Sequence, residues 1–201
     1  ATFLRNRPTS TEYLPYSRPA VPQISSRSLF DPPSAQAIAE MKSEQLRANL
    51  LTRVGEGDYS VLIDASANPN LYNEVLTALV ARDSDVRPIA SYLSAHPELR
   101  ANAQLAQAFI KVWDENPKRS ELATMLHLAA LSDNADVYWL AVDMAKQAWD
   151  EGRLIQVSPK ELAAAIDAQY WLLNTEARES GAGFVLKRYV ASVRRELNTT
   201  K

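Results

Sequence analysis

Two pairs of adjacent carboxylates are the residues whose types and spacing could do chemistry. Asp114–Glu115 and Asp150–Glu151 each follow a tryptophan. Paired carboxylates can work as general acid and base or bind a hard cation. Both pairs stand at predicted helix C-termini, where negative charge is mildly unfavourable with the helix dipole and needs a nearby cation. Three cations lie just beyond the pairs: Lys118, Arg119 and Arg153. We therefore interpret the carboxylates as partners in local ion pairs at turns.

The two histidines add no catalytic or metal-binding constellation. His96 precedes a proline and is predicted to cap a helix, whereas His127 falls mid-helix among apolar neighbours. The chain has no cysteine, which excludes thiol chemistry and favours a reducing compartment, although the location stays unknown. No Ser-His-Asp grouping, phosphate-binding loop or dinucleotide fingerprint occurs. The sequence thus predicts no catalytic residue, no cofactor and no metal site.

Positive charge gathers near the two ends of the chain. The last predicted helix carries Lys187, Arg188, Arg194 and Arg195, and the first 33 residues carry Arg5, Arg7, Arg18 and Arg27. Such residues could contact phosphates, as in a nucleoprotein whose arm follows the strand. The formal net charge of −2 argues against a general affinity for polyanions. A solvated helix face and an arm that pairs with an acidic neighbour explain the same residues.

Residues 1–33 are predicted to form an extended arm. Six prolines leave little room for a helix, because each ring removes a donor and restricts its predecessor. Apolar side chains recur between them, unlike in a free disordered tail. We expect the arm to dock on a neighbouring subunit; folding back over its own domain is the alternative. The partner-binding candidates are Phe3, Leu4, Tyr13, Leu14 and Tyr16 in the arm, together with Trp139 and Trp149.

The rest of the chain, residues 34–201, is predicted to be one helical domain. The first helix should cover residues 34–53, and Asn70 should cap a later one. His96-Pro97-Glu98 should separate two further helices, and Gly181-Ala-Gly183 should separate the last two. The motif Ser158-Pro159-Lys160-Glu161 is a capping box with proline at the first helical position. The longest apolar stretch, residues 122–131, is about half the ~20 residues of a membrane span.

An internal repeat is one of two architectures that fit this all-α pattern. The triplet Trp-Asp-Glu at residues 113–115 recurs at residues 149–151, an offset of 36. Stacked αα-hairpin repeats have periods in this range. The pair Glu121-Leu122 instead matches Glu161-Leu162 at an offset of 40. We therefore expect either an irregular helical bundle or an αα-hairpin repeat of about seven to eight helices.

These observations favour a non-catalytic structural or adaptor subunit of a larger protein assembly. Its partners would be other protein subunits, bound through the arm and the helical faces. The alternative is a nucleic-acid-coating structural protein that uses the basic arm and the basic last helix. An enzyme of unfamiliar type would depend on the carboxylate pairs alone.

Overall fold

The computed structural model describes residues 34–200, and all regular elements within them are helices. The ten helices are α2 (Ala35–Gly55), α3 (Val61–Ala65), α4 (Pro69–Arg82), α5 (Arg87–Ala95), α6 (Ala103–Glu115), α7 (Arg119–Leu131), α8 (Ala135–Asp150), α9 (Pro159–Tyr170), α10 (Thr175–Glu179) and α11 (Gly181–Thr199). The predicted all-α class is confirmed for these residues, whereas the predicted number of seven to eight helices is too low. The arm, residues 1–33, lies outside the described residues.

The chain divides into two compact units, Ala1–Glu44 and Gln45–Lys201. In the first unit the described residues form the first half of α2, where the Ser34 hydroxyl accepts the Ala37 amide at 3.1 Å. The second unit contains the rest of α2 and all the other described helices. The predicted boundary between an arm and a helical domain at residue 33 stays a prediction.

Four asparagines begin helices in the second unit, each by accepting a backbone N–H of the first helical turn. They are Asn68 before α4, Asn102 before α6, Asn134 before α8 and Asn174 before α10. A side-chain cap of this kind stabilises a helix by about 1 kcal/mol, because it pairs an amide that otherwise has no partner. The Ser158 hydroxyl does the same for α9 by accepting the Glu161 amide, as the capping box predicted.

Two predicted helix starts are wrong because a nearby asparagine provides the cap. The Asn70 amide itself donates to the Asn68 side chain, so α4 begins at Pro69. After His96 the chain does not enter a helix directly; α6 begins only at Ala103, beyond a connection that buries Leu99. The sequence pattern had predicted a helix here. Burying Leu99 stabilises the connection without one.

The last predicted boundary is wrong because Ser180 caps α11. Its hydroxyl accepts the Gly183 amide at 2.9 Å, so both glycines of the 181–183 segment lie in the first turn of α11. The short helix α10 occupies the preceding residues and was not predicted. Its five residues are too few to carry a recognisable apolar period.

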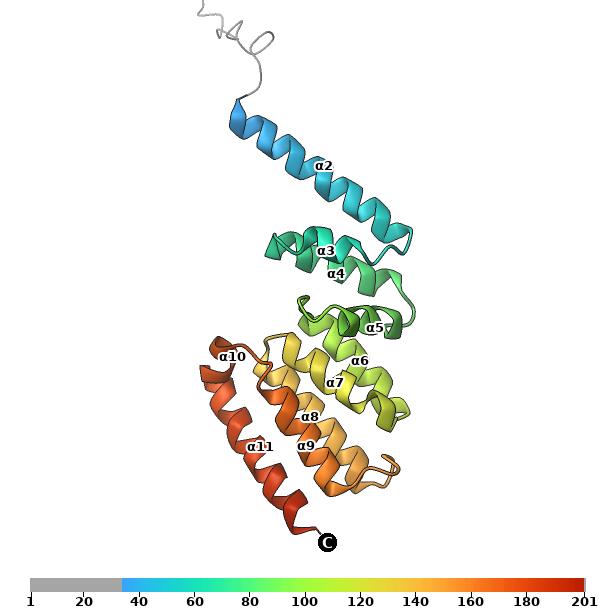
Figure 1. Cartoon of the computed structure of the whole chain (residues 1–201), viewed down its shortest axis with the longest axis vertical. Coiled ribbons are helices and arrows are strands. Elements are labelled where there is room, and N and C mark those ends of the chain that lie inside the picture. Colours follow the sequence, from blue (N-terminus) through green and yellow to red (C-terminus); the bar gives the residue numbers. More distant parts are fainter. Residues whose placement is uncertain (1–33, 201) are drawn as a thin grey trace, which may run out of the picture. The chain divides into compact units, whose positions relative to one another are not determined.

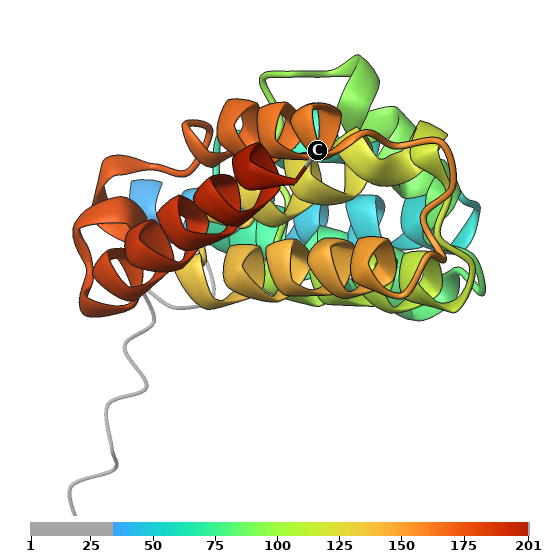
Figure 2. The same cartoon turned by 90° about the horizontal axis from the view of Figure 1, so that it is seen from below.

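Within Gln45–Lys201 the helices form two layers. Helices α4, α6 and α8 contact one another in order, and α7 contacts α5 and α9 in the opposite layer. Figure 1 shows these helices following one another along the unit, and Figure 2 shows α11 running obliquely across its last pair. Helix α11 contacts both α8 and α9, one from each layer.

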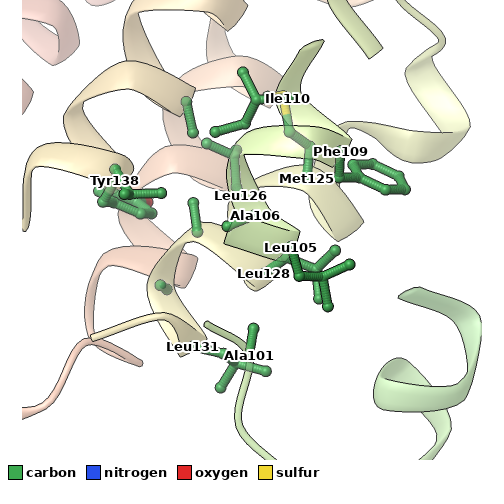
Figure 3. Close-up of a cluster of buried hydrophobic side chains, with 14 of the residues drawn as sticks. Ala101, Leu105, Ala106, Phe109, Ile110, Met125, Leu126, Leu128, Leu131 and Tyr138 are labelled. Atoms are coloured by element: carbon green, nitrogen blue, oxygen red, sulfur yellow. The ribbon is translucent and has the colours of Figure 1, made fainter. Parts of the chain in front are cut away.

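The core between the layers is continuous and apolar. Its largest fully buried side chains are Trp113 and Tyr138. Figure 3 shows apolar side chains of α6 and α7, among them Leu105, Phe109 and Leu126, gathered in this core. Burying each large apolar side chain contributes roughly 1.5–3 kcal/mol. The Tyr138 hydroxyl donates to the Ile166 carbonyl of α9, which satisfies its one polar atom. Burial raises the pKa of Tyr138 well above its usual range.

Gly183 is the position where α10 and α11 meet most closely. A Cβ at this residue would lie nearer than 3.0 Å to the carbonyl oxygens of Ala177 and Arg178, which real Cβ atoms do not tolerate. At Gly181, the first residue of the same turn, a Cβ would have no atom within 4 Å. The two glycines therefore differ sharply in what they permit, although both lie in the first turn of one helix.

We expect Gly183→Ala to destabilise the protein by about 1–3 kcal/mol, because the added methyl must push α10 away from α11. Gly181→Ala is the matched control and should change stability by less than about 0.5 kcal/mol. Urea denaturation followed by circular dichroism measures both. Equal effects of the two substitutions would contradict the close approach at Gly183.

Candidate functional site: helix α11

The carboxylate pairs at the ends of α6 and α8 take part in ion pairs within the chain. Arg153 connects them: Nε lies 2.6 Å from Glu151 Oε2, and Nη2 lies 3.1 Å from Asp114 Oδ1. These hydrogen bonds, with Glu151 the stronger cause, raise the pKa of Arg153. Asp150 pairs with Lys146 at 2.7 Å. Glu151 thus pairs locally as predicted, whereas Asp114 pairs with Arg153 from the other turn, 39 residues away, and Asp150 pairs with Lys146, a cation that was not predicted for this role.

The other two cations named for this role behave differently. Arg119 pairs with Glu161 of α9 at 2.8 Å, and Lys118 makes no ion pair with a described residue. The histidines also have partners within the chain. His96 caps α5 as predicted, and its ring stacks on Tyr92, whereas His127 Nδ1 lies 3.2 Å from Gln169 Oε1. Among residues 34–200 no group of three histidine, aspartate or glutamate side chains could hold a metal ion.

Of the predicted partner-binding residues, Trp139 and Trp149 are described, and both are half-buried. The Trp139 ring packs on Tyr189 of α11 with centroids 4.8 Å apart. Trp149 donates its indole N–H to the Val157 carbonyl at 3.1 Å. Both tryptophans therefore contact their own chain, and a role in partner binding stays a prediction. The arm residues with the same predicted role lie outside the described part.

Helix α11 is held in place by one apolar stripe and one buried lysine. The stripe follows a three- and four-residue spacing: Gly183, Leu186, Val190, Val193 and Leu197 are all buried. Lys146 of α8 has a 7% exposed side chain, with Nζ 2.7 Å from Asp150 and 3.0 Å from Glu196 of α11. Burial alone would lower the pKa of Lys146, but hydrogen bonds to Asp150 and Glu196 outweigh it and raise the pKa.

The opposite side of α11 carries a second stripe that is largely exposed. Phe184, Arg188, Ala191, Arg195 and Asn198 follow at intervals of four and three residues, which places them on one helix face. Phe184 is 62% exposed, and the neighbouring Val185 is 61% exposed. A helix with one buried stripe normally presents polar residues outward, so exposed phenylalanine and valine here are unusual.

Three of the four predicted nucleic-acid residues lie together on this side of α11. Arg188, Arg194 and Arg195 line a surface hollow of about 700 Å³, whereas Lys187 does not. Tyr189, Ala191, Ser192 and Asn198 complete the lining. Arg194 lies 3.5 Å from Asp167 of α9, so it is partly neutralised. The sequence had placed all four basic residues on one helix but had not separated Lys187 from the other three.

One exposed aromatic residue, Trp171, was not singled out as exposed from the sequence. Trp171, just after α9, is 62% exposed and lies under the Arg178 guanidinium, 5.1 Å from the ring centroid. A tryptophan at the end of an apolar helical pattern reads as a core residue. Only its position after the last turn of α9 turns it outward.

No family model, no curated protein and no solved structure matches this chain. Within residues 34–200 no helix combines the length and apolar character that crossing a membrane requires. The geometry of the chain itself is therefore what supports any functional argument.

Lys146→Met should lower the free energy of unfolding, because the lysine joins α8 to α11 through ion pairs. The loss should be only about 1 kcal/mol, because the two carboxylates are half-exposed. Its folded-state pKa lies above that of an unfolded lysine, so this contribution is fully present below about pH 10 and is lost as the pH rises through the folded-state value. Denaturation at pH 7 and pH 11 measures both effects. Lys160→Met, at an exposed lysine, is the control; an equal loss there would contradict the role of Lys146.

Proposed function

We propose that this chain is a non-catalytic structural or adaptor subunit of a larger protein assembly. The observation that carries the proposal is the exposed stripe of α11, where aromatic and arginine side chains share a face opposite the buried stripe. Aromatic residues and arginine are the side chains that contribute most to protein–protein interfaces. Exposed large apolar side chains next to polar ones mark such surfaces.

We further propose that the helices form an αα-hairpin repeat, which suits a scaffold. Equivalent contacts recur at the starts of successive helices in one layer. Arg87, the first residue of α5, pairs with Glu121 of α7 at 3.0 Å, and Arg119, the first residue of α7, pairs with Glu161 of α9 at 2.8 Å. Each glutamate is the third residue of its helix. An irregular bundle would need to produce this correspondence twice by coincidence.

The Trp-Asp-Glu triplets occupy corresponding places in the proposed repeat. Trp113 donates its indole N–H to the Lys118 carbonyl at 3.1 Å, and Trp149 donates to the Val157 carbonyl at 3.1 Å. Both acceptors immediately precede the first residue or the cap of the next helix. Asparagine caps also begin α6 and α8, so the triplets close two helix pairs of the same design. The longer second connection explains why the two sequence offsets, 36 and 40, differ.

Native-state hydrogen exchange distinguishes the repeat from a bundle. In a repeat each pair contacts only its neighbours, so we expect the highest protection in α6, α7 and α8 and lower protection in α3 and α10. Amides of the outer helices should then exchange through local opening. A single opening free energy shared by the slowest amides of all helices would contradict the repeat.

The arm is proposed to dock on a neighbouring subunit through its apolar side chains. Replacing Phe3, Leu4, Tyr13, Leu14 and Tyr16 with serine in the full chain should abolish co-purification of its stoichiometric partners from the native source. The circular dichroism spectrum should remain helical, since the described core contains none of these residues. The matched variant replaces Arg5, Arg7, Arg18 and Arg27 with glutamine and should keep the partners. An intact complex with the serine variant would remove the arm from the proposal.

A nucleic-acid-coating protein is the second candidate, favoured by the hollow that Arg188, Arg194 and Arg195 line. Phosphate contacts would give an affinity that falls steeply as salt concentration rises. This candidate would be favoured if the arginine-to-glutamine arm variant lost nucleic-acid binding and the serine variant kept it.

A further inference from the structure

The exposed stripe of α11 contains two arginines that differ from all others in the described part. Nine of the eleven arginines between residues 34 and 200 have side chains in a hydrogen bond, an ion pair or both. Arg188 and Arg195 make neither with a described residue. An arginine fork has five donors that favour a planar carboxylate or phosphate. The guanidinium groups of both arginines, on one face of one helix, can therefore bind a carboxylate or phosphate of another molecule.

The spacing of these residues fits a helix as the occupant. Arg188 and Arg195 are seven residues apart, about 10 Å along the axis of an α-helix. Ala191 stands between them, and its small side chain leaves the surface hollow into which another helix can settle. Phe184 lies one turn before Arg188 and offers an apolar contact at the same face. Residues at intervals of four and three are those that meet a partner helix in side-by-side packing.

The charge of α11 decides the chemistry of the occupant. The helix holds four cations and one carboxylate, a formal charge of +3, in a chain of formal charge −2. The one carboxylate, Glu196, forms an ion pair with Lys146. Residues 1–33 cannot supply the complement, because they contain four arginines against Glu12 and Asp31. The occupant should therefore carry negative charge, which favours another molecule over residues 1–33.

We propose that the outer face of α11 binds an amphipathic helix of a partner protein that carries carboxylates seven residues apart and an apolar side chain one turn from them. The carboxylates would each take one arginine fork, and the apolar side chain would cover Phe184. The proposal deepens the adaptor function and rests on it. The hollow at Ala191 between the two arginines suits the close packing of a second helix, which is why an acidic helix is favoured over nucleic acid.

Fluorescence anisotropy with the full chain tests this. The probe is a labelled 21-residue peptide with leucines on one face and three glutamates at seven-residue spacing beside them. A second peptide of the same composition has its glutamates at irregular spacing, and the third probe is a 20-nucleotide single strand of DNA. We expect the heptad-spaced peptide to bind and the irregular peptide to bind at least about 5-fold more weakly, because only one of its carboxylates can meet an arginine.

The double variant Arg188→Glu/Arg195→Glu should weaken binding of the heptad-spaced peptide at least about 10-fold. The matched control, Lys111→Glu/Lys118→Glu, changes the net charge equally at exposed lysines of α6 and the following loop, and should change binding less than about 3-fold. Equal losses in the two variants would reduce the effect to net charge and overturn the proposal. Tighter binding of the DNA, lost in the arginine variant, would overturn it in favour of phosphate recognition.

No binding of the heptad-spaced peptide up to about 1 mM would also overturn the proposal, because an affinity below the ~4 kcal/mol of that concentration is too weak to hold an adaptor on its partner. The adaptor function is tested by a different measurement, the co-purification of partners with the arm variants. If the peptide does not bind but the native complex still depends on the apolar residues of the arm, the α11 proposal alone is wrong.

Discussion

Burial of the second half of α7, residues 125–131, is the constraint on which the compact unit depends. Six of these seven residues are buried, and they point around the whole helix rather than along one stripe. A helix that is apolar all round is stable in water only when other helices surround it. Helices α5, α6, α8 and α9 do so from both layers. The order and direction of these neighbours follow, because each must turn an apolar side toward α7.

Helix α11 is the opposite case, because the fold uses only one of its sides. It buries one stripe on α8 and α9 and is anchored by Lys146, so its orientation is fixed without using its outer side. The outer side then carries side chains that the fold does not need: Phe184, Arg188 and Arg195. Of these, Phe184 is costly to leave exposed, and burying it against a partner would stabilise a complex.

Ion pairs in this chain mostly stabilise connections between helices rather than prepare chemistry. Arg153 joins the ends of α6 and α8, and Arg119 joins α7 to α9. Each such surface pair contributes at most about 1 kcal/mol, but together they fix which helix ends lie side by side. Three of the four carboxylates that first suggested acid–base chemistry belong to this set. Their partners are Arg153 and Lys146.

The sequence by itself determined the helical class and the Ser158 cap, because these depend on local spacing and on hydrogen bonds within a few residues. It also placed Lys187, Arg188, Arg194 and Arg195 on one helix, of which the last three line one hollow. Only the tertiary structure decided that Trp171 and Phe184 face outward, and that Arg188 and Arg195 lack partners. Exposure and pairing depend on which distant helices arrive at a surface, and the pattern within one helix carries no record of them.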